Sequence, residues 1–198
     1  MRLSRLALVV AAAALLLAGC ATGAGDYPVT PVEPGPVVAI SAAPVPAAVP
    51  PPGVPVKVAI PKLGVTDNIV PVGLAADGSM EVPDVTETGW YELAPRPGSV
   101  GSAVVISHVD YRGVPGAFAR IDELRLGDEV RVTDVAGIER NFVVFDSAQV
   151  PKSEFMSRTV PLVFDSPPGP ELRMVTCGGD LVGHSYLSNV IVRARLAA

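Results

Sequence analysis

The chain has 198 residues, of which 49% are hydrophobic, 18% charged and 5% aromatic. This length fits one ordinary domain with an additional terminal segment and excludes two large domains. The net charge of −5 disfavours an extended phosphate-binding surface, so nucleic acid is not an expected partner. The 21 prolines and 19 glycines exceed ordinary usage and predict that part of the chain is a linker.

The first twenty residues have the pattern of an export signal. Arg2 and Arg5 precede an uncharged hydrophobic run over residues 6–17, which is shorter than the about 20 apolar residues that span a bilayer. The run ends in Leu-Ala-Gly-Cys at positions 17–20, which resembles a bacterial lipobox. We therefore expect residues 1–20 to be a lipoprotein signal, Cys20 to be lipidated, and the protein to be extracytoplasmic and attached to the membrane. The alternative is an ordinary signal peptide or short anchor with an incidental cysteine.

Residues 21–55 form a segment of unusual composition. They contain ten prolines, no Lys or Arg, and only Asp26 and Glu33 as charged residues. No amphipathic period runs through them, and proline favours extended polyproline II chain. We expect a disordered tether here, followed by one folded domain over residues 56–198.

The folded part has the pattern of an all-β domain, with short strands separated by turn signals. Asp77-Gly78 and Ala136-Gly137 mark hairpin turns. Only residues 117–124 have helical spacing, with three apolar residues facing a core. The economical fold is a closed eight-stranded β-barrel with one or two short helices, because closure removes exposed strand edges. The candidate strands are 56–60, 70–74, 80–82, 103–106, 129–133, 140–150, 161–164, 172–176 and 189–196.

Two side chains stand out as chemical candidates. Cys177 lacks a partner because Cys20 belongs to the export segment, and such a thiol is intermolecular, buried and inert, or reactive. His108 and Cys177 each follow an apolar strand where it opens into a loop. Alternation along the strand puts Cys177 on the face opposite Leu172 and Met174, so it points outward if these two residues fill the barrel. A thiol and an imidazole together suit nucleophilic acyl transfer.

The surrounding sequence resembles the sortases, and the class F group most closely. The matching segments are 60–65, 89–91, 101–110, 124–128 and 170–179, including Ser-His-Val-Asp at 107–110 and Thr-Cys-Gly-Gly at 176–179. The resemblance implies a sortase barrel and a cysteine transpeptidase of the thiol-protease type. It implies cleavage of an LPxTG-like sorting signal through a thioester on Cys177, with His108 as general acid and base. An amine such as that of a peptidoglycan precursor would then accept the acyl group, and the expected envelope is of the Gram-positive type.

The resemblance also bears on partners and cofactors. It implies a monomer that works without a cofactor. His108 and Asp110 alone do not make a metal site, because no further His or Cys clusters near them, so no metal is expected.

One position departs from the family pattern. Leu187, within Tyr-Leu-Ser-Asn at 186–189, stands where the family has an arginine that donates hydrogen bonds to the substrate, and leucine has no donor. The candidate replacements are Arg193, Arg195 and His184. The alternative is that Arg193, Arg195 and Arg173 are solvated or ion-paired on the barrel exterior, and that His184 is a loop residue without a role. The missing arginine also leaves open a non-catalytic, envelope-binding barrel.

Overall fold

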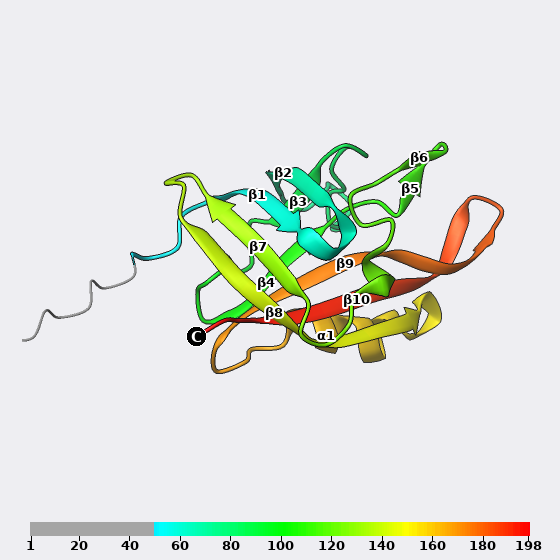
Figure 1. Ribbon diagram of the computed structural model, residues 1–198. Coiled ribbons are helices and arrows are strands. Elements are labelled where there is room, and N and C mark those ends of the chain that lie inside the picture. The colour runs from blue at the N-terminus through cyan, green and yellow to red at the C-terminus, as the bar shows by residue number, and fades with distance from the viewer. Residues whose placement is uncertain (1–49) are drawn as a thin grey trace, which may run out of the picture. The chain divides into compact units, whose positions relative to one another are not determined.

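The computed structural model describes residues 50–198 (Figure 1). The export segment, Cys20 and residues 21–49 of the expected tether lie outside them. No helix within the described part is long and apolar enough to cross a bilayer. The strands are β1 (Pro55–Ile60), β2 (Val65–Val72), β3 (Thr88–Tyr91), β4 (Gly101–Ile106), β5 (Asp110–Tyr111), β6 (Val114–Pro115), β7 (Glu129–Asp134), β8 (Glu139–Pro151), β9 (Pro170–Val182) and β10 (Ser185–Leu196). The helical elements are η1 (Pro61–Leu63), η2 (Ile121–Glu123), η3 (Lys152–Glu154), η4 (Phe155–Thr159) and α1 (Val160–Phe164).

Eight of these strands close into a barrel in the order β1-β2-β3-β4-β9-β10-β8-β7, which confirms the expected all-β fold. β5 and β6 form a separate hairpin outside the barrel. Most neighbouring strands are antiparallel, but β2 with β3 and β4 with β9 are parallel. The parallel pair β4–β9 matters for function, because parallel strands end at the same edge of a sheet.

The barrel interior is filled by alternate residues of its strands, as period-2 patterning predicts. In β4, Ala103 and Val105 face this interior, whereas Val104 faces outward and is covered by Val163 of α1. β4 is therefore buried on both faces, as its continuous apolar run predicts. The inward residues include Val58, Ile60, Val130, Val132, Phe142, Leu172, Met174, Val190 and Val192.

The helix expected over residues 117–124 is wrong in type and length. Only η2 is helical there, and its hydrogen bonds join residues three apart, as from the Leu124 amide to the Ile121 carbonyl. Phe118, Ile121 and Leu124 are nonetheless buried in the core. Their spacing of three matches a 3-10 turn, which explains why the burial was predicted correctly and the α-helix was not.

Two expected strands are also wrong. Residues 161–164 form part of α1, where Pro161 occupies the first turn and needs no amide hydrogen bond. The closed barrel offers this segment no free edge, so it packs as a helix on the outer face. Residues 80–82 form only one bridge, between Met80 and Leu74, across the predicted turn. β3 was not predicted, because it has only four residues and includes a glycine.

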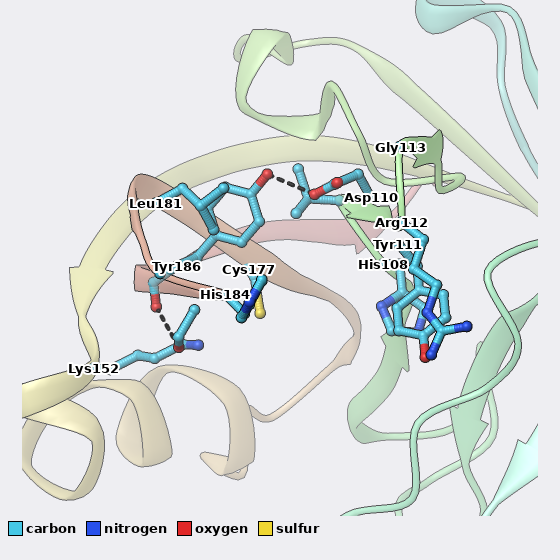
Figure 2. Close-up of a pocket in the computed structure, with 13 residues that line it drawn as sticks. His108, Asp110, Tyr111, Arg112, Gly113, Lys152, Cys177, Leu181, His184 and Tyr186 are labelled. Atoms are coloured by element: carbon cyan, nitrogen blue, oxygen red, sulfur yellow. Dashed lines mark hydrogen bonds between the residues drawn. The ribbon is translucent and has the colours of Figure 1, made fainter.

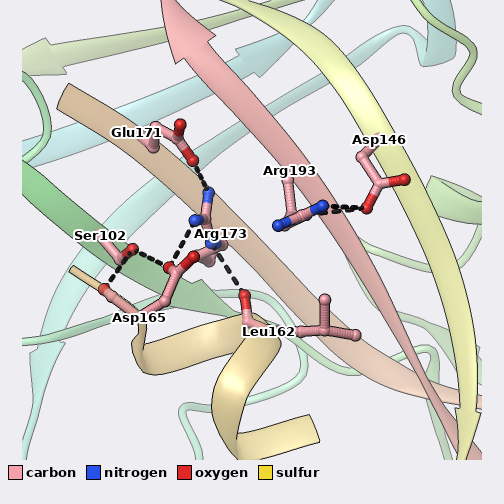
Figure 3. A network of polar contacts seen from close by, with 7 residues as sticks. All are labelled: Ser102, Asp146, Leu162, Asp165, Glu171, Arg173 and Arg193. Atoms are coloured by element: carbon pink, nitrogen blue, oxygen red, sulfur yellow. Dashed lines mark hydrogen bonds and ion pairs between the residues drawn. The ribbon is translucent and has the colours of Figure 1, made fainter. Parts of the chain in front are cut away.

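A buried arginine joins α1 to the barrel (Figure 3). The Arg173 side chain is 0% exposed and forms ion pairs with Glu171 and, at 2.6 Å, with Asp165. Its Nε donates to the Leu162 carbonyl oxygen at 2.9 Å, and Ser102 donates to Asp165 at 2.8 Å. Burial alone would raise the pKa of Asp165, but these hydrogen bonds and the charge of Arg173 outweigh it and lower that pKa. Arg173 is thus ion-paired on the outer face of the barrel, but enclosed rather than solvated.

A second buried ion pair holds the beginning of the described chain. Arg140 bonds Asp134 at 2.7 Å, with the two side chains 7% and 3% exposed. Asp134 also accepts from the Gly53 amide at 3.0 Å, and Arg140 donates to the Pro50 carbonyl at 3.0 Å. Residues 50–54 therefore contact the barrel just ahead of β1.

Candidate active site

The parallel strands β4 and β9 carry the two predicted site residues to one edge of the barrel. Their register pairs Ile106 with Val175. The next residues along the two chains are Ser107 and Thr176, which therefore lie level with each other, and His108 and Cys177 follow them. The Thr176 hydroxyl donates to the Ser107 carbonyl oxygen at 2.8 Å in a buried hydrogen bond. The end of β4 is therefore fixed to β9 immediately before His108 and Cys177. The expectation that Cys177 follows the end of its strand is wrong, because β9 continues through Cys177 to Val182 by pairing with β10.

Two glycines allow the loops at this edge to close. A Cβ on Gly116 would lie 2.2 Å from the His108 carbonyl oxygen, so only glycine fits beneath the His108 loop. Gly179 has a φ of +74° and lies where the β9–β10 register shifts, and a Cβ there would meet the Ser188 hydroxyl at 2.8 Å. Glycine adopts this left-handed conformation without a steric penalty.

His108 and Cys177 line one cavity of about 680 Å³. Figure 2 shows His108, Tyr111 and Arg112 on one side of it, and Cys177, His184 and Tyr186 on the other. Cys177 also lines an adjoining cavity of about 170 Å³. Its thiol is partly exposed and unpaired among the described residues, so it is accessible to a ligand. No hydrogen bond joins the His108 and Cys177 side chains in the described structure.

A hydrogen bond connects the two sides of the larger cavity. The Tyr186 hydroxyl, from β10, donates to Asp110 Oδ1 of the β5–β6 hairpin at 2.6 Å. This hydrogen bond is the largest cause of a raised pKa of the Tyr186 hydroxyl. Burial and the charges of Asp110 and Cys177 raise that pKa further. The bond holds the His108 loop against the hairpin that follows Cys177.

The structure separates the candidate replacements for the family arginine. His184 lines the larger cavity. Arg193 donates to Asp146 at 2.8 Å, and both Arg193 and Arg195 lie over the Phe145 ring, at 5.1 and 4.4 Å from its centroid. Neither arginine lines either cavity, and neither does Leu187, which is 49% exposed.

Sequence reasoning missed five polar residues of the larger cavity, of which Tyr186, Arg112 and Lys152 matter most here; the other two are Tyr111 and Ser185. Tyr186 directly precedes Leu187, and Arg112 lies two residues after the His-Val-Asp segment, so the neighbouring motifs were signals that could have found both. Lys152 lies far from both segments in the sequence, and no local pattern marks it. No cluster of three His, Cys, Asp or Glu side chains within residues 50–198 has the geometry of a metal site.

A family model described as the Sortase domain matches residues 58–197 of this chain. The chain belongs to the sortase family. The solved structures agree in fold. Sortase A from Corynebacterium diphtheriae matches with a TM-score of 0.58 and 16% identity, over 75% of this chain and 62% of that one. Sortase C-1 from Actinomyces oris matches with a TM-score of 0.56 and 19% identity, over 72% and 73% of the two chains.

A third solved structure, sortase C from Clostridium perfringens SM101, matches with a TM-score of 0.55 and 17% identity, over 74% of this chain and 72% of that one. A comparison with curated proteins gave no match. Membership of the sortase family implies a cysteine transpeptidase. The class F assignment stays a prediction from the sequence.

Proposed function

We propose that this sortase is an exported, membrane-attached cysteine transpeptidase that cleaves an LPxTG-like sorting signal and transfers the acyl group to an amine. The observation that carries the proposal is the shared cavity: Cys177 and His108 line it together, where the parallel pairing of β4 with β9 ends and the Thr176 hydrogen bond joins the two segments. A partly exposed nucleophile and an acid–base group at one cavity are the minimum set for acyl transfer.

In the first step the Cys177 sulfur, as thiolate, attacks the carbonyl carbon of the scissile peptide bond. The C–N bond breaks as the tetrahedral intermediate collapses, and a thioester forms on Cys177. His108 in its protonated form gives its proton to the departing amine, which is a poor leaving group without it. The partly buried position of His108 beside the cavity is compatible with this role.

In the second step the amine acceptor attacks the thioester carbonyl carbon. The new amide C–N bond forms, the C–S bond breaks, and His108 takes the proton that the amine loses. Cys177 is released as the thiolate and His108 as the protonated form, so the site is ready for another cycle. Water in place of the amine would give hydrolysis.

The negative oxygen of each tetrahedral intermediate needs hydrogen-bond donors. Because Leu187 has none and Arg193 is held by Asp146, we propose the backbone amides next to Cys177 and the His184 side chain as donors. His184 lines the cavity and is exposed, so it can turn toward a bound substrate.

The test is acylation of Cys177 by a panel of sorting peptides, followed as a thioester by mass spectrometry. We expect a thioester in the native protein and no acyl-enzyme in Cys177→Ala. Cys177→Ser should form very little acyl-enzyme, and that only as an oxygen ester. Loss of general acid catalysis in His108→Ala is expected to slow turnover by about 10² to 10⁴-fold. Native rates in either alanine variant would overturn the mechanism.

The alternative, a non-catalytic envelope-binding barrel, is favoured by Leu187 alone. The two functions differ in thiol reactivity. A catalytic Cys177 reacts rapidly with a thiol-directed sulfone and loses that reactivity in His108→Ala, whereas a binding module shows the same slow reaction in both.

A further inference from the structure

The β5–β6 hairpin carries an arginine in an unfavourable backbone conformation. β5 ends at Tyr111 and β6 begins at Val114, which pair directly, so Arg112 and Gly113 form a two-residue turn. Both have positive φ, +51° for Arg112 and +81° for Gly113. Such a turn favours Asn-Gly or Gly-Gly, because L side chains other than Asn and Asp rarely adopt positive φ. Within residues 50–198, Arg112 is the only residue other than glycine with positive φ.

The turn places the Arg112 guanidinium at the cavity that Cys177 lines. The guanidinium lies over the Tyr111 ring, 5.2 Å from its centroid, and that ring lies 5.6 Å from the His108 ring (Figure 2). Among the other exposed arginines of the described structure, Arg120 and Arg158 have a carboxylate partner, Arg96 and Arg125 donate to backbone carbonyls, and Arg195 lies over the Phe145 ring. Arg112 has no ion pair and no side-chain hydrogen bond in the described structure, so its fork of N–H donors is free.

The other charges at the cavity do not neutralise Arg112. Lys152 and His184 add basic groups, and Asp110 is the single carboxylate in the lining. Asp110 already accepts the Tyr186 hydroxyl. The cavity is therefore locally positive in a chain whose net charge is −5, and such a site favours an anionic group on its ligand.

We propose that Arg112 binds a carboxylate of the substrate in the cavity that Cys177 lines, and so determines substrate specificity. A guanidinium binds a carboxylate through two parallel N–H donors, a geometry that Lys does not reproduce. The carboxylate belongs either to the amine acceptor or to the sorting peptide. The inference rests on the proposed function for the identity of these two substrates.

The test compares substrates that differ only in one carboxylate. The acceptor pair is glycylglycine and glycylglycinamide, and the sorting-peptide pair carries Glu or Gln at the variable position of an LPxTG-type sequence. We expect Arg112→Asn to raise KM for the acidic member of one pair by about tenfold to a hundredfold, with little change in kcat, and to leave its amide partner unaffected. The pair that responds identifies the source of the carboxylate.

The variants separate binding from folding. Asn suits the turn, so Arg112→Asn is expected to keep or raise the melting temperature while it loses the preference for the acid. Arg112→Lys is expected to keep only part of that preference. Arg158→Gln, an exposed arginine outside both cavities, is the matched control and should leave KM unchanged. An equal effect of Arg112→Asn on acid and amide in both pairs would overturn the inference.

A binding measurement distinguishes this inference from the proposed function. The four probes are titrated calorimetrically into Cys177→Ala and into Cys177→Ala/Arg112→Asn, where no turnover is needed. The inference is supported if Cys177→Ala binds the acidic probe of a pair more tightly than its amide and the double variant does not. This holds even if the native protein forms no thioester. Absence of binding by all four probes, or no preference for an acid, overturns it even if the thioester forms.

Discussion

At the scale of single residues, the position of Leu187 relative to Cys177 is the most informative. Asn189 pairs directly with Cys177 across the β10–β9 ladder, and Leu187 lies two residues before Asn189, near the start of β10. Leu187 lies at the irregularity where the β10–β9 register shifts between Tyr186 and Ser188, so strand alternation from Asn189 does not extend to it. It is nevertheless the next residue after Tyr186, which lines the cavity of Cys177. Its half-exposed side chain leaves room for a longer one.

We predict that Leu187→Arg accelerates acylation of Cys177. A guanidinium at this position can donate to the oxyanion, a bond that strengthens as charge develops, so kcat should rise by about tenfold or more while KM changes less. Single-turnover acylation measures this, with Leu187→Met as the control without a donor. Unchanged or slower acylation would show that the backbone and His184 already satisfy the oxyanion, or that the introduced guanidinium does not reach it.

The hydrogen bond between Thr176 and Ser107 gives a second prediction at this scale. Thr176→Val keeps the shape of the side chain but removes the donor to a buried carbonyl, which should lower the free energy of unfolding by about 1–3 kcal/mol. It should also lower kcat, because the segments immediately before His108 and Cys177 lose their connection. Denaturant unfolding and turnover are compared with those of Thr176→Ser, which keeps the hydroxyl. Native turnover in a destabilised Thr176→Val protein would contradict the positioning role.

At the scale of elements, Arg173 determines how α1 is held against the barrel. Its side chain reaches from β9 to the Leu162 carbonyl and Asp165, while Ser102 of β4 bonds the same carboxylate (Figure 3). One buried side chain thus connects the strand that carries Cys177 to the helical segment outside it. A fully buried guanidinium needs these partners, because an unpaired charge in the interior is strongly unfavourable.

We predict that Arg173→Met lowers the free energy of unfolding by about 3 kcal/mol, because it leaves Glu171 without its partner and removes the bond to Leu162. Limited proteolysis should then cut the segment 155–165 earlier than in the native protein. Arg193→Met is the matched control, since its pair with Asp146 is partly solvated and should contribute less than about 1 kcal/mol. Equal losses in the two variants would argue against a special role for the buried network.

At the scale of the whole molecule, the buried pair of Asp134 and Arg140 makes stability depend on pH. The hydrogen bond from Arg140 is the largest effect on the pKa of Asp134 and lowers it, while burial raises it. Hydrogen bonds from the amides of Ile138, Gly53 and Ala136 lower it further, and the net result is a fall from 3.8 to about 2. The folded state therefore binds this proton less readily than the unfolded state. The resulting stabilisation is present above about pH 4 and is lost as the pH falls toward 2.

We predict that this group contributes roughly 2 kcal/mol to the acid sensitivity of the fold. Asp134→Asn should be less stable at pH 7, where Arg140 stays buried without a counter-charge, and its stability should fall less between pH 4 and 2. Urea unfolding at several pH values measures both effects. Glu123→Gln, which alters an exposed and solvent-screened pair with Arg120, should change the pH profile much less. A native profile in Asp134→Asn would contradict the assignment.

Much of the fold follows from local patterns in the sequence. Strands with clear alternation or apolar runs, such as 129–133 and 103–106, were predicted nearly to the residue. The errors lie where tertiary context decides: residues 161–164 are apolar enough for a strand, and only the closed barrel makes them a helix. Phe118, Ile121 and Leu124 were assigned to the core correctly, yet to the wrong helix type, because burial and hydrogen-bond pattern are set by different interactions.

The sequence by itself determined the barrel class, the family resemblance and the two candidate residues His108 and Cys177, because strand patterning and short motifs are local properties. Only the tertiary structure decided what surrounds those residues. The cavity is built from segments far apart in the chain, the β5–β6 hairpin, Lys152 and the end of β9–β10. Their approach depends on the parallel pairing of β4 with β9 and on the bond between Tyr186 and Asp110, which are contacts between residues about 70 positions apart.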